Sequence, residues 1–273
     1  MQKGHDHDRL NEVQRFLDLD DYSEEQHRKE WETHVRAVDR DEEINTEILQ
    51  QMRGPELDTL RAREDYQAWS NSEQSCLLIL SGYNDISIDR AYQCWLSPIA
   101  EATLNELGQR KPRPFYAYHA LPQQGKLLFA VLSVFLLQLL RQKSSVLRDE
   151  RRYAELRTQL GKLHQTEMDE DDRISAVESI AIRVIDFFDE SEVLYIVMDR
   201  ADRCRDPKKA DADHRKTLLR VFVKMVEAAR CRLKILTVVN GRDWRVENYR
   251  NDLGAKMMER LIVCTVEQRV RDW

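Results

Sequence analysis

The sequence predicts an α/β protein: a mostly parallel sheet of five strands, sandwiched by helices and preceded by a helical extension. Two patterns predict this fold. From residue 73 onward, short apolar runs alternate with longer amphipathic segments, the order that builds parallel strands joined by crossover helices. Before residue 73 the chain is dense in charge, and apolar residues recur at helical spacing. We therefore expect a charged helical region at 1–72 and an α/β domain at 73–273.

The N-terminal region is expected to form helices separated by one clear break. Val13 and Leu17 are spaced as on one helix face, and Gly54-Pro55 interrupts the helical pattern. Glycine commonly follows a helix end and proline commonly opens a helix, so one helix should end before this pair and another should begin at it. These helices can pack on the body, remain solvated or bind a partner protein, because the heptad pattern is too irregular to predict a coiled coil.

Four of the five predicted strands are short runs rich in leucine, isoleucine and valine, and the run at 115–119 is mainly aromatic. Buried parallel strands read as near-continuous apolar runs because helices cover both of their faces. The five runs are residues 76–81, 115–119, 193–198, 233–239 and 261–266. The segments between them have helical periodicity and are expected to form helices at 98–109, 127–142, 145–163, 173–188, 214–230 and 246–259. Ser97 is the expected N-cap before Pro98, and the acidic cluster at 168–172, which begins with Met168, indicates another helix start.

Composition argues against several classes of function. Residues 127–140 are the most apolar stretch, but they are shorter than the ~20 residues that span a bilayer, so a buried helix is expected and no membrane partner. The net charge is −6 and basic residues are scattered, so nucleic acid is not an expected partner. The five cysteines are odd in number and widely spaced, which is typical of a reducing, cytoplasmic setting.

The most informative segment is the strand at 193–198, which runs directly into Asp199 and then Asp202. Ligands of open α/β sheets bind outside the carboxyl ends of the strands, and an apolar strand followed by two aspartates is typical of proteins that hold a metal ion with a nucleotide. The alternative is an ordinary strand followed by a polar turn, because aspartate is common where strands end.

Three elements in order resemble the NACHT-type STAND NTPases, a P-loop family, and particularly the fungal group with nephrocystin-like NTPase domains. They are the strand that ends in Ser81-Gly82, the strand that ends in Asp199, and the strand at 233–239. In that group the second of these strands commonly ends as D-A-L-D-E-C, and residues 199–204 of this chain read D-R-A-D-R-C. The resemblance covers roughly residues 56–268 and implies a P-loop NTPase-like fold.

The resemblance also implies a nucleotide site that holds ATP or GTP with magnesium. Asp199 corresponds to the metal-linked aspartate of the family, and Asp202 corresponds to its second, catalytic aspartate. The candidate nucleotide-binding residues after the first strand are polar or small, namely Ser81, Gly82, Asn84 and Ser87. Arg242 follows the fourth strand, where the family often carries a polar or arginine sensor of nucleotide state, and a simple turn residue is equally consistent with its position.

The motifs also depart from the family pattern. A working phosphate loop, G-x-x-x-x-G-K-S/T, needs a lysine to neutralise phosphate and a hydroxyl to hold magnesium. After Gly82 the chain reads Y-N-D-I-S-I-D-R, without a second glycine or a Lys-Ser or Lys-Thr pair. In the later motif, Arg203 replaces the family's glutamate and Arg200 adds a cation beside Asp199. These arginines can pair with the aspartates and occupy the place of a metal.

These departures predict a degenerate STAND/NACHT-like domain that acts as a signalling or assembly module, with weak or no nucleotide hydrolysis. One alternative is a slow magnesium-dependent NTPase that uses Asp199 and Asp202. The other is a scaffold without nucleotide that binds protein partners through its N-terminal helices. A domain that holds no cofactor is as consistent with the sequence as one that holds ATP or GTP with magnesium, and an oligomer is compatible with either.

Overall fold

The computed structural model describes residues 2–40, 55–84, 96–122, 124–164, 168–206, 214–246, 248 and 259–268. At its centre lies one sheet of five strands in the order β2-β3-β4-β1-β5. The strands are β1 (Cys76–Asn84), β2 (Phe115–Ala120), β3 (Val193–Asp199), β4 (Arg232–Asn240) and β5 (Leu261–Gln268). Every neighbouring pair is parallel, so the predicted α/β class with a five-stranded parallel sheet is confirmed.

Because all five strands point the same way, their carboxyl ends form a single edge of the sheet. Gly82 at the end of β1 lies opposite Asn240 at the end of β4, and Ala120 at the end of β2 lies opposite Asp199. β4 separates β1 from β3, so Gly82 and Asp199 stand two strand spacings apart, roughly 10 Å across the sheet. The two segments that carry the predicted site residues therefore meet at this edge.

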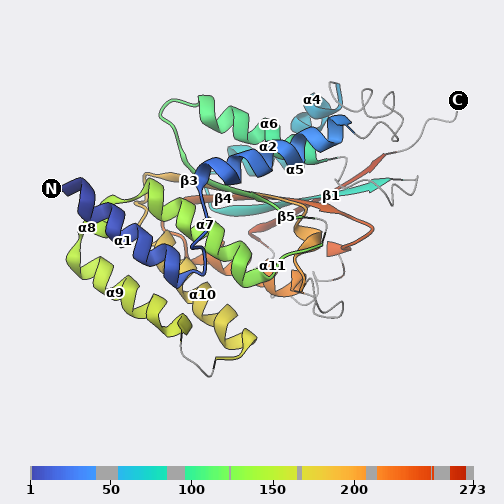
Figure 1. Ribbon diagram of the computed structural model, residues 1–273. Helices are drawn as coiled ribbons and strands as arrows, with labels where there is room; N and C mark the ends of the chain where they lie inside the picture. The colour runs from blue at the N-terminus through green and yellow to red at the C-terminus, as the bar shows by residue number, and fades with distance from the viewer. Residues whose placement is uncertain are drawn as a thin grey trace, which may run out of the picture.

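Helices cover both faces of the sheet (Figure 1). Alternate strand residues separate into two cores, as the two-residue period of a strand requires. Leu77 and Ile79 join the core formed with α7 (Leu128–Gln142), α10 (Glu170–Ile185) and α11 (Arg215–Ala228). Leu78 and Leu80 join the core on the other face, formed with α2 (Glu24–Arg40), α4 (Pro55–Ala62), α5 (Glu64–Asn71) and α6 (Ser97–Gln109).

The first two helices pack on opposite faces of this sheet (Figure 1). α1 (Gln2–Phe16) contributes Val13 to the core of α7, and Leu17 just after the helix joins the same core. α2 contributes Trp31 to the core of α6. Of the arrangements that the sequence leaves open for the N-terminal helices, the structure has α1 and α2 docked on the α/β body.

Several predicted helix boundaries can be compared with the structure. α4 begins at Pro55, as the break at Gly54-Pro55 predicts, and Asp169 caps α10 by accepting from the N–H of Asp172 at 2.8 Å. The predicted N-cap at Ser97 is wrong, because Leu96 is the capping position and no side chain caps the helix. The predicted helix at 246–259 falls largely outside the described residues.

The single helix predicted at 145–163 is three short ones, α8 (Ser145–Arg148), α9 (Glu150–Gly161) and η1 (Lys162–His164). The physical reason is Asp149, whose backbone is extended and whose side chain accepts from the N–H groups of Arg151 and Arg152. An aspartate in this role starts a new helix instead of continuing the old one. Within the described ranges, no helix has both the length and the apolar character needed to cross a bilayer.

The outer edge of β2 is covered by two glutamines of α7. Gln138 accepts from the N–H of Tyr118 at 2.9 Å and donates to the carbonyl of Tyr118 at 2.9 Å. Gln142 makes the same two bonds with Tyr116. The side-chain amides take the place of a neighbouring strand, so these backbone groups of the edge strand are already paired. The sequence suggested a buried helix here, and this use of its polar residues was not predicted.

Candidate functional site

The two candidate carboxylates lie at the carboxyl end of β3. Asp199 is the last residue of this strand, and Asp202 lies in the short 3₁₀ helix η2 (Ala201–Arg203) that follows. Their exposed fractions are 1% and 3%. A carboxylate removed from water in this way needs hydrogen-bond donors or a cation, because its desolvation is otherwise uncompensated.

Arg200 supplies the cation for Asp202. Its Nε lies 3.1 Å from both carboxylate oxygens and its Nη2 lies 2.7 Å from Oδ2, so two nitrogens of the guanidinium donate hydrogen bonds to the carboxylate. The backbone of Arg200 is left-handed, at φ 58° and ψ 42°, a conformation that is unfavourable for a residue with a side chain. This turn lets two residues so near in sequence face each other, and the pairing of an arginine with an aspartate that the sequence suggested is confirmed for Arg200 and Asp202.

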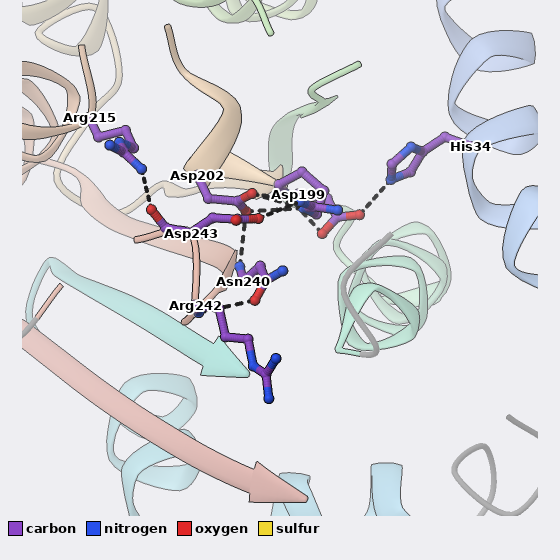
Figure 2. A network of polar contacts seen from close by, with 8 residues as sticks. His34, Asp199, Asp202, Arg215, Asn240, Arg242 and Asp243 are labelled. Carbon is purple, nitrogen blue, oxygen red and sulfur yellow. Dashed lines mark hydrogen bonds and ion pairs between the residues drawn. The ribbon is translucent and has the colours of Figure 1, made fainter. Parts of the chain in front are cut away.

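Asp202 also ties η2 to the end of β4. Its Oδ1 accepts from the backbone N–H of Asn240 at 2.9 Å (Figure 2). Arg200 extends the network to Asp243, whose Oδ2 lies 3.3 Å from Nη2, and the carbonyl of Asp243 in turn accepts from Arg215 of α11. Asp202 therefore has a clear structural role, which is to fasten the loop after β3 to the neighbouring strand.

Asp199 is held by a residue from a different part of the chain. Its Oδ1 accepts from the N–H of Arg200 at 3.0 Å, and its Oδ2 lies 2.7 Å from Nε2 of His34 in α2 (Figure 2). An ionised carboxylate only accepts hydrogen bonds, so His34 is the donor. His34 is a site residue that sequence reasoning missed.

α2 reaches the site because its inner face docks on the end of β2. The ring of Trp31 packs edge-on against Tyr118, with ring centres 5.2 Å apart. His27 lies 2.9 Å from the carbonyl of Tyr118 and its ring stacks on His119. These contacts place the helix across the carboxyl ends of β2 and β3, where it brings His34 to Asp199.

Two imidazoles, His27 of α2 and His119 of β2, are buried close to Lys126. Burial lowers the pKa of His27, and burial together with the positive charge of Lys126 lowers the pKa of His119 well below its ordinary value. The ammonium of Lys126 lies 3.5 Å from Nε2 of His119, and burial lowers its own pKa too. Both histidines are therefore neutral in the folded protein near pH 7.

The end of β1 carries the residues that the sequence assigns to a phosphate loop. Ser81 is buried, and its hydroxyl has no hydrogen-bond partner among the described residues. The carbonyl of Gly82 accepts from the N–H of Gly241 at 2.9 Å, which ties the start of this loop to the turn after β4. Asn84 is the last residue of β1, and Ser87 lies outside the described residues.

Arg242 and Arg203 have different surroundings. The N–H of Arg242 donates to Oδ1 of Asn240 at 3.1 Å, and its side chain extends away from the carboxylates (Figure 2). The structure therefore does not bring the Arg242 guanidinium to Asp199 and Asp202. Arg203 is 7% exposed, and burial together with the charge of Arg200 lowers its pKa to about 10, although the nearby aspartates act in the opposite direction.

This arrangement does not fit a magnesium ion well. Each oxygen of Asp199 and Asp202 already accepts a hydrogen bond, and a fixed guanidinium neutralises Asp202. In the parts of the chain that the structure describes, no three His, Cys, Asp or Glu side chains are grouped so that they could hold a metal ion. A metal at Asp199 would have to compete with His34, so the role of Asp199 as a metal ligand stays a prediction.

No model of a known protein family matches the chain, and no curated protein matches it. The resemblance to NACHT-type NTPases therefore rests on the residues quoted from the sequence.

Proposed function

We propose that the chain is a degenerate STAND/NACHT-like domain that acts as a signalling or assembly module, with weak or no nucleotide hydrolysis. The observation that carries this proposal is the buried ion pair of Arg200 and Asp202. In a working site, metal ions and cations stabilise the transferring phosphoryl group while carboxylates hold the metal and position the nucleophile. Here the second carboxylate is used to neutralise a guanidinium of its own loop.

The ion pair makes a catalytic role for Asp202 costly. Removing one partner of a buried pair destabilises a protein by about 3–5 kcal/mol, because the other charge is left uncompensated. Asp202 would have to leave Arg200 and the N–H of Asn240 before it could act on water or metal. Its present contacts support a structural role for this residue.

The end of β1 supports the same proposal. The sequence after Gly82 lacks the lysine and hydroxyl pair that neutralises phosphate and holds magnesium. A ligand shifts a conformational equilibrium only by its differential affinity for the two states. The loss of these groups therefore removes much of the difference in affinity by which a nucleotide could shift the equilibrium. Binding to protein partners is the role that remains for such a domain, and the outer face of α2 carries exposed charges that include Glu25 and Arg28.

A thermal-shift titration with ATP, ADP and GTP, each with and without magnesium, tests this proposal. A nucleotide present at a hundredfold excess over its Kd stabilises the native state by about 2.7 kcal/mol, which raises Tm by roughly 5 °C or more in a chain of this size. We expect no such shift at millimolar nucleotide. A magnesium-dependent shift or phosphate release that disappears in Asp199→Asn would contradict the proposal and favour the slow NTPase.

A further inference from the structure

We propose that α2 is an autoinhibitory strap: it covers the carboxyl ends of β2 and β3, occupies Asp199 through His34, and can open while the sheet and the Arg200–Asp202 pair stay folded. The purpose of opening rests on the proposed function, since it would expose the site to a partner. The opening itself is a property of the fold and can be measured without any partner.

Among the residues of α2 whose side chains the structure describes, 24–34, three anchors at helical spacing form the inner face. His27, Trp31 and His34 lie at positions i, i+4 and i+7, the pattern with which a helix binds a groove through one face. Trp31 packs on Tyr118, His27 bonds to the backbone of β2, and His34 bonds to Asp199. These three contacts with β2 and Asp199 come from one face of the helix.

The other described residues of α2 are exposed and mostly charged. They are Glu24, Glu25, Gln26, Arg28, Lys29, Glu30, Glu32 and Thr33. By contrast, α7 on the opposite face is buried along nearly its whole length. Segments with few buried apolar contacts open locally at a lower free energy than the core, so α2 is expected to detach before α7 or the strands do.

Detachment of α2 would affect the two carboxylates unequally. Asp202 keeps its donors, because Arg200 and Asn240 belong to the β3 loop and the end of β4. Asp199 keeps the N–H of Arg200 but loses His34, so one buried oxygen is left without its donor. Any cation or donor group that binds Asp199 at this oxygen must therefore take the place of His34, which makes α2 a competitor built into the chain.

The inference can be tested by carboxylate labelling of the full chain. A water-soluble carbodiimide with glycinamide converts accessible carboxyl groups to amides, and fragmentation mass spectrometry separates Asp199 from Asp202 in one peptide. The variants are Trp31→Ala and His34→Ala, with Thr33→Ala as the matched control on the exposed face of the same helix. Exposed Asp243 reports that the reagent is active in every sample.

We expect the labelling rate of Asp199 to rise at least tenfold in Trp31→Ala and His34→Ala, while Asp202 stays at its wild-type rate and Thr33→Ala changes neither. His34→Gln, which keeps an N–H donor, should restore part of the protection of Asp199. Hydrogen exchange should rise in residues 24–34 and stay unchanged in β3 and β4. An equal increase in the labelling rates of Asp199 and Asp202 would overturn the inference, because α2 would then open only when the whole fold opens. No increase at Asp199 would also overturn it, because α2 would then not cover the site. Neither result depends on nucleotide, so it is separate from the thermal-shift test of function.

Discussion

Asp199 and Asp202 lie in one short loop, yet the fold holds them in different ways. Asp202 is bound by Arg200 and by the end of β4, which are its neighbours in the sheet edge. Asp199 depends for one of its hydrogen bonds on His34, which belongs to a helix far away in the sequence. The comparison teaches that two carboxylates close in sequence can depend on different parts of the fold. Asp202 is held by its own loop and the end of β4, whereas Asp199 also needs the docking of α2 for one of its two hydrogen bonds.

The largest effect is expected from breaking the local pair. Arg200→Ala leaves the Asp202 carboxylate buried without its cation, so the free energy of unfolding should fall by about 3–5 kcal/mol. The loss should be smaller in Arg200→Gly, because glycine adopts the left-handed backbone of this position without strain. Urea denaturation measures the change. Arg242→Ala is the matched control at an exposed arginine near the same edge and should change stability by less than about 0.5 kcal/mol. A loss under about 1 kcal/mol for Arg200→Ala would show that the pair does not hold the loop.

The next effect comes from the docking of α2. Trp31→Ala removes the apolar anchor of this helix and should lower the free energy of unfolding by about 3 kcal/mol, the lower end of the range for a buried tryptophan. Circular dichroism during urea denaturation provides the measurement. If the loss matched that of an exposed substitution such as Lys29→Ala, α2 would not be anchored by Trp31.

A smaller loss of stability is expected when the hydrogen bond between His34 and Asp199 is removed. His34→Ala removes a hydrogen bond to a charged acceptor and should cost about 2 kcal/mol, less than Arg200→Ala, because Asp199 keeps the N–H of Arg200. The same denaturation series compares the two variants directly. A cost for His34→Ala that equals or exceeds the cost for Arg200→Ala would reverse the ranking of the two carboxylates.

The smallest effect is expected from pH. Burial lowers the pKa of His27 and His119 below the ordinary value of 6.5, so the unfolded chain binds more protons than the folded chain in mild acid. This contribution to stability is fully present above pH 6.5 and is lost as the pH falls below it. The urea midpoint should therefore drop between pH 7.5 and pH 5.5, and the drop should be smaller in His27→Gln. An identical pH dependence in this variant would exclude His27 as one of the titrating groups.

Much of this architecture could be predicted because local patterns determine it. The apolar runs at 76–81 and 193–198 correspond to β1 and β3, since a strand covered on both faces must be apolar throughout. The pairing of Arg200 with Asp202 could also be anticipated, because the two residues share a loop. Contacts that depend on tertiary placement could not. Nothing near His34 in the sequence indicates that it meets Asp199, because that contact exists only once α2 is docked across β2.

The glutamines that cover β2 also affect how the chain can fold while it is being synthesised. β2 leaves the ribosome before β3, the strand that will pair with it, so its backbone is initially open on both sides. α7 follows β2 closely in the chain and brings Gln138 and Gln142 to one of those sides. A nascent chain can thus pair the outer side of β2 with its own next helix, which leaves only the side that awaits β3 open to mispairing with other chains.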